Sequence, residues 1–105
     1  MILTTTNSVE DKSIISYLGI VTGTTYVVNY GTKGMSFRDM FKAQKYYDNY
    51  EKGIEDAKEA AFQKLKDNAD QLQANAIVGI SVDIEMMSSN GVSMVSVVGT
   101  AVRVH

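Results

Sequence analysis

The chain lacks cysteine, proline and tryptophan, and its single histidine is the last residue, His105. Without cysteine it forms no disulfide, no thiolate metal site and no cysteine nucleophile, which fits a cytosolic protein. Ten basic and twelve acidic residues give a net charge of −2, so the chain has no excess of positive charge with which to bind nucleic acid. Residues 1–6 lack the basic and long apolar regions of a signal peptide. No apolar run approaches the roughly 20 residues that span a bilayer, so we expect a soluble, cytoplasmic protein with no membrane partner.

The patterning of apolar residues predicts an α+β fold. Residues 13–28 are rich in β-branched and aromatic types, which favours one long or bent strand, and residues 2–4 form a short extra strand. Gly19 and Gly23 within the long strand each indicate a bulge or the close approach of another backbone.

A short helix is expected after Ser36. Between residues 50 and 72 the apolar positions recur every three to four residues, which predicts a long amphipathic helix ended by Asn75 in a left-handed conformation. The stripe consists of Ile54, Ala57, Ala61, Leu65, Ala69 and Leu72.

The C-terminal segment predicts a hairpin whose last strand is apolar on both sides. A two-residue Asn90–Gly91 loop would place Met87 opposite Met94 and Glu85 opposite Ser96. One face would then cover the helix, and the other would expose apolar residues that cost several kcal/mol in water at about 25 cal/mol per Å². The N-terminal strand, the segment 37–41 or a second subunit could cover them, and we favour a homo-oligomer. The face expected toward the helix carries Val78, Ile80, Val82, Ile84, Met86, Val95, Val97 and Ala101. The opposite face carries Ser81, Asp83, Glu85, Met87, Val92, Met94, Ser96, Val98, Thr100 and Val102, with Met94, Val98 and Val102 at the interface.

Four segments together resemble the YbjQ-like family, a group of small proteins of uncharacterised function that carry a heavy-metal-binding label. The segments are 16–23 (SYLGIVTG), 37–41 (FRDMF), 74–80 (ANAIVGI) and 94–102 (MVSVVGTAV), in the family's order. The resemblance implies one domain over residues 1–105 with a dodecin-subunit-like fold: an antiparallel sheet packed on one long helix, plus a short helix. It also implies a ring of subunits, with a pentamer as the implied assembly. The chain departs from the family pattern at Thr24, Gln73 and Asn75, where the family commonly has Glu, Gly and Asp, so a ligand role of the two missing carboxylates is in doubt.

The candidate metal ligands are few. Asp83 and Glu85 alternate on one strand face and would gather into a hard-ion site in a ring, or else form a solvated strand edge. Met87 and Met94 offer thioethers to a soft ion, although methionine more commonly serves packing. His105 is terminal, a position that is more often frayed than a ligand.

Other polar and aromatic residues suggest a ligand site or an interface. Arg38 could bind an anion or pair with a carboxylate. Tyr26, Tyr30 and Tyr47, with their neighbours Tyr46 and Tyr50, could line a pocket or an interface. No catalytic motif is present, so an enzyme is not expected. The sequence thus predicts a homo-oligomer, implied to be a pentamer, that binds a metal ion or small ligand at subunit junctions. The alternative is an assembly or interaction scaffold without a ligand.

Overall fold

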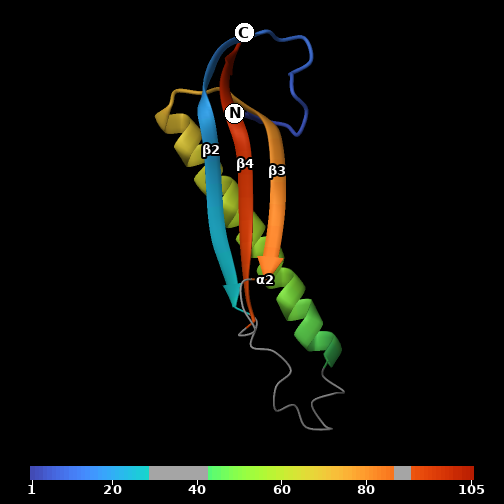
Figure 1. The fold of residues 1–105 in the computed structure, drawn as a ribbon. Coiled ribbons are helices and arrows are strands. Elements are labelled where there is room, and N and C mark those ends of the chain that lie inside the picture. Colours follow the sequence, from blue (N-terminus) through green and yellow to red (C-terminus); the bar gives the residue numbers. More distant parts are fainter. Residues whose placement is uncertain (29–42, 87–90) are drawn as a thin grey trace.

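A computed structural model describes residues 1–28, 43–86 and 91–105, with side chains for 1–27, 51–86 and 91–105. Its elements are β1 (Ile2–Leu3), β2 (Ile14–Val28), α2 (Ala43–Gln71), β3 (Ala76–Met86) and β4 (Val92–Val104). The strands form one sheet in the order β1-β3-β4-β2, and α2 crosses one face of it (Figure 1). The α+β prediction is confirmed. The sheet is mixed and not purely antiparallel, because β1 runs parallel to β3. The short helix expected after Ser36 lies outside the described residues.

The two glycines predicted to be special in β2 have different roles. Gly19 has a φ of 138° and lies at a shift in the β2–β4 register, so it marks a β-bulge. Gly23 lies directly under α2, where a Cβ atom would approach the Leu65 nitrogen to 2.9 Å and the Ala61 carbonyl oxygen more closely still. The helix therefore rests on the strand backbone at Gly23.

The helix ends differently from the prediction. Gln73, with a φ of 63°, is the left-handed residue, and Asn75 is not. The amide of Asn75 instead bonds the backbone of Val104, accepting from its nitrogen at 2.8 Å and donating to its oxygen at 2.9 Å. Asn75 thus extends the ladder between the start of β3 and the end of β4.

The predicted hairpin exists, but its register differs by two residues. Glu85 pairs with Met94 and Asp83 with Ser96, so Met94 does not lie opposite Met87. The predicted two-residue loop at Asn90–Gly91 is therefore wrong, because it would require Glu85 to pair with Ser96. A shift of two residues preserves which side chains share a face.

A bulge in β3 overturns the predicted placement of Val78. Val78 pairs with Thr100 and Ser81 with Val98, so β3 has one extra residue between them, where Gly79 adopts a φ of 62°. The extra residue reverses the alternation of side chains. Val78 consequently packs on the face away from α2, whereas Ile80 packs in the core beneath the helix.

Two apolar clusters hold the layers together. The larger one joins α2 to the sheet through residues such as Leu65, Val95 and Val97. The smaller one lies on the opposite face, where Ile2, Val9 and Ile14 cover Val102 completely. The N-terminal segment, which was one of the predicted covers, therefore buries Val102, and Val102 is not available to a second subunit. Its earlier assignment to an oligomer interface is wrong for this reason.

Candidate functional site

The face of the sheet opposite α2 carries a band of polar side chains. The cross-strand register sets Thr24, Ser96 and Asp83 in one row, and Tyr26, Met94 and Glu85 in the next. Residues in directly opposed positions on one face have neighbouring side chains. We call the surface made by these two rows and by Ile20, Thr22 and Val98 the open face.

The open face also exposes large apolar groups. Ile20 is 77% exposed, Tyr26 60% and Val98 37%. Met94 is partly buried between its neighbours on the outer strands. Of the predicted interface residues, Met94 and Val98 therefore lie together on this surface, next to Tyr26.

Two carboxylates of the open face are the best-placed candidate ligands. Asp83 and Glu85 lie two residues apart on β3 and are both exposed, with the Ser96 hydroxyl and the Met94 thioether opposite them. Within the ranges 1–28, 43–86 and 91–105, no group of three or more His, Asp or Glu residues could hold a metal ion. Ca²⁺ takes 6–8 oxygen ligands, so a single copy supplies only part of such a site.

The remaining predicted site residues divide into two groups. Tyr30, Arg38 and Met87 lie outside the described residues, and Tyr47 is placed only as a backbone position on α2. His105 has an exposed side chain, but its backbone exchanges hydrogen bonds with Ser13 at 3.0 and 3.1 Å. The terminal residue is therefore fixed at the end of the sheet.

The outer edges of the sheet are features that sequence reasoning missed. At the β2 edge, two α2 side chains bond strand carbonyls: Lys64 Nζ donates to Thr24 at 2.8 Å, and Asn68 Nδ2 donates to Thr22 at 2.8 Å. At the β3 edge, beyond β1, no such cap is found among the described side chains. The spacing of Lys64 and Asn68 on one helix face was visible in the sequence, but its relation to β2 required the sheet order.

Comparisons with known proteins give one consistent result. The model of the YbjQ family, described as "Putative heavy-metal-binding", matches residues 1–105. UPF0145 proteins of Bacillus thuringiensis and Bacillus cereus are each 39% identical over 106 residues, covering 99% of this chain and 100% of theirs. A crystal structure of a DUF74-family protein of unknown function from Pediococcus pentosaceus has the same fold, with a TM-score of 0.60 and 24% identity over 100% of this chain and 98% of that one. Among the described residues, no helix is long and apolar enough to cross a membrane.

Proposed function

This chain belongs to the YbjQ family, and we propose that it works as a subunit of a homo-oligomer that binds a divalent cation where copies meet. The observation that carries the proposal is the open face, which presents Ile20, Tyr26 and Val98 to solvent beside two carboxylates. Apolar groups gathered on a sheet face mark an interaction surface. A ring of copies, with five as the number suggested by the family resemblance, would cover them.

The surface area of the chain supports burial between copies. A folded monomer of 11.5 kDa is expected to expose about 5,800 Å², whereas this chain exposes 7226 Å². The chain thus exposes about 1,400 Å² more than a compact monomer of its mass, and surface of this extent is available for contacts between copies. The extents of 60 × 24 × 17 Å are consistent with the packing of α2 on one face of the sheet, as the described residues show it.

The cation would be held by Asp83 and Glu85 contributed by more than one copy. Carboxylate and hydroxyl oxygens suit Mg²⁺, Ca²⁺ and Mn²⁺, whereas soft metals prefer thiolates and thioethers. The chain has no cysteine and one histidine. On the open face, two carboxylates and a hydroxyl stand beside a single thioether, that of Met94, so the donor set fits a hard divalent cation better than a thiophilic one.

Native mass spectrometry tests the assembly, and cation titration tests the cation binding, so the two parts of the proposal are tested separately. Val98→Asp should lower the subunit number, because a charge on the open face opposes its burial between copies. Met86→Asp is the matched control, since Met86 is also exposed but lies on the helix side of the sheet. A wild-type protein that sediments as a single folded subunit at micromolar concentration would disprove the assembly.

Calorimetric titration with Ca²⁺, Mg²⁺, Mn²⁺ and Zn²⁺ tests the ligand. We expect binding of a hard cation by the wild type and loss of its heat in the Asp83→Asn, Glu85→Gln double variant at unchanged mass. An oligomer that gives no heat with any of these ions would support the alternative, an assembly scaffold without a ligand, which the same open face also favours.

A further inference from the structure

We propose that the outer edge of β3, from Val82 to Met86, is a docking site for an extended peptide in which apolar residues alternate with lysine or arginine. The peptide would add to the sheet as a further strand next to β3. This inference goes beyond the proposed function but shares two residues with it. Because Asp83 and Glu85 are also the proposed cation ligands, the peptide and the cation would compete for them, so peptide binding is measured without added divalent cation.

The backbone of β3 is available for pairing over this stretch. β1 and the residues after it cover the beginning of the edge, where the Gly79 and Ile80 nitrogens donate to Thr6 and Thr4 at 2.8 and 3.1 Å. Among the described residues, no strand continues this cover beyond Ile80. A free strand edge of this kind accepts an added strand through main-chain hydrogen bonds.

The hydrogen-bonding direction of each residue follows from the ladder. On β2, the Thr22 and Thr24 carbonyls accept hydrogen bonds from side chains of α2. The backbone N–H and C=O groups of these two residues therefore point away from β4. The backbone groups of their partners, Val98 and Ser96, must then point toward β3 and bond with Ser81 and Asp83, because the two sides of a central strand alternate. Ser81, Asp83 and Glu85 therefore bond to β4, and the N–H and C=O groups of Val82, Ile84 and Met86 point outward.

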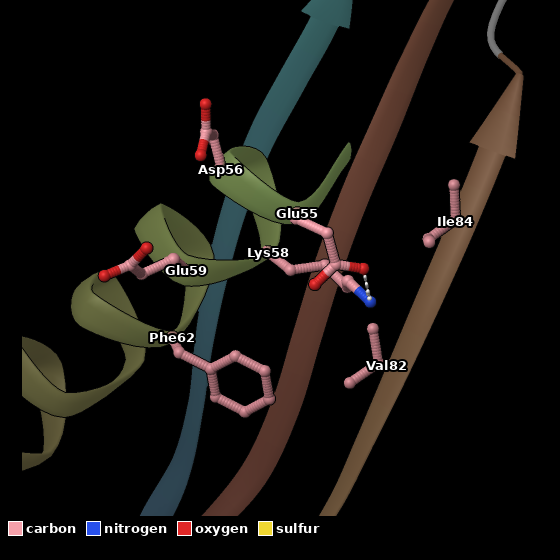
Figure 2. A pocket seen from close by; sticks show the side chains of 7 residues that line it. All are labelled: Glu55, Asp56, Lys58, Glu59, Phe62, Val82 and Ile84. Carbon is pink, nitrogen blue, oxygen red and sulfur yellow. Dashed lines mark ion pairs between the residues drawn. The ribbon is translucent and has the colours of Figure 1, made fainter. Parts of the chain in front are cut away.

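A hollow lies on the helix side of this edge, apolar at Phe62, Val82 and Ile84 and lined along α2 by charged residues. Its volume is about 500 Å³, and Phe62 reaches from α2 toward Val82 and Ile84, which line the strand side (Figure 2). A second hollow of about 400 Å³ continues past Phe62 to Leu3 and Thr4. Val82 and Ile84 are 44% and 45% exposed. Side chains of an added strand that pointed toward the helix would thus meet an apolar floor.

The other side of the same edge is acidic. Asp83 and Glu85 alternate with Val82 and Ile84, so an added strand would set every second residue beside a carboxylate on the open face. At the hollow, Glu55 is already paired with Lys58 at 2.6 Å, and Asp56 and Glu59 point away from β3 (Figure 2). The charge that an added strand meets directly is therefore that of Asp83 and Glu85, which calls for basic residues at alternate positions.

The contrast with β2 strengthens the inference. β2 forms the other edge of the sheet, and there Lys64 and Asn68 occupy two outward carbonyls. Covering an edge in this way blocks strand addition. Within residues 1–28, 43–86 and 91–105, side chains thus cover one edge of the sheet and leave the Val82–Met86 stretch of the other uncovered beside the hollow.

Fluorescence anisotropy with a synthetic probe tests the docking. The probe is a blocked, fluorescein-labelled seven-residue peptide that alternates valine and lysine, and the comparison peptides replace lysine with glutamate or N-methylate the central valine. We expect binding of the lysine peptide only, because the glutamate peptide meets Asp83 and Glu85 and the N-methylated peptide loses a main-chain donor. Equal binding of all three peptides, or no binding of the lysine peptide at millimolar protein, would overturn the proposal.

Two protein variants locate the site. The Asp83→Asn, Glu85→Gln variant should weaken the lysine peptide by about 3- to 30-fold, as expected for two exposed charge pairs. The control Glu10→Gln, Asp70→Asn makes the same change of charge at exposed residues elsewhere and should leave binding unchanged. Ile84→Pro removes an outward donor without touching the β4 ladder and should abolish binding. If the Ile84→Pro protein instead assembles with fewer subunits than the wild type, the edge is an interface between copies and the inference is wrong.

Discussion

Gly23→Ala should destabilise the protein strongly, because α2 rests on the β2 backbone at this residue. An added Cβ atom would lie 2.9 Å from the Leu65 nitrogen and nearer to the Ala61 oxygen, whereas ordinary contacts begin at 3.4 Å. The helix would have to retreat by about 0.5 Å at Leu65 and further at Ala61. Both opposing atoms belong to the helix backbone, so no side-chain rotation relieves the clash.

The magnitude follows from overpacking in a close-packed interior. Such insertions cost about 1–3 kcal/mol, and the involvement of backbone atoms places Gly23→Ala near the upper end, at about 2–3 kcal/mol. For a domain of this size, 1 kcal/mol corresponds to roughly 4–8 °C in Tm. We therefore expect Tm to fall by roughly 8–24 °C in thermal unfolding followed by circular dichroism at one fixed protein concentration.

Gly53→Ala is a control with the opposite expected sign. Gly53 lies inside α2, and its added Cβ would make only an ordinary 3.4 Å contact with Val27 Cγ1. Alanine in a helix interior is more favourable than glycine by about 0.5–1 kcal/mol, so Tm should rise by a few degrees. A Gly23→Ala protein that melts within about 2 °C of the wild type would refute the described contact between α2 and β2.

Three further changes probe individual hydrogen bonds. Asn75→Asp replaces the amide donor with a carboxylate facing a carbonyl of the last strand, and should cost about 1–3 kcal/mol in urea unfolding at neutral pH; an unchanged midpoint would contradict the paired bonds. Thr25→Val removes a buried 2.7 Å hydroxyl bond to the Ala57 carbonyl and should cost about 1 kcal/mol by the same measurement. Lys64→Ala with Asn68→Ala uncovers the β2 edge and should raise the aggregated fraction measured by light scattering, while each variant alone should have a smaller effect.

The individual helix and strands could be predicted from the sequence, because each depends mainly on residues that are neighbours in the chain. The repeat of small and apolar residues predicted α2, although the helix begins at Ala43, several residues before the expected start. The β-branched run predicted β2, and Gly19 and Gly23 each adopted one of the two roles foreseen for them.

Strand pairing, strand order and burial could not be predicted in the same way, because they depend on residues that are distant in the chain. The parallel pairing of β1 with β3, the order of the strands and the burial of Val102 arise only when the ends of the chain meet. The hairpin register was wrong because the loop was placed at Asn90–Gly91, two residues out of the observed register.

The candidate site was predicted in part for the same reasons. Asp83 and Glu85 were expected on one face and lie there together with Met94 and Val98, because a register error of two residues leaves the faces intact. The open β3 edge was missed, since which strand ends a sheet is a property of topology and not of any segment.

The extra residue near Gly79 makes β3 sensitive to length in a way that substitutions do not reveal. Deleting Gly79 would shift the remainder of the strand by one position and exchange its two sides. Asp83 and Glu85 would then turn inward beneath α2, and Val82 and Ile84 would turn out to the water. A one-residue change in spacing at this point would thus damage the protein more than the loss of any single side chain that follows it, so the length of this short stretch is fixed more strictly than its composition.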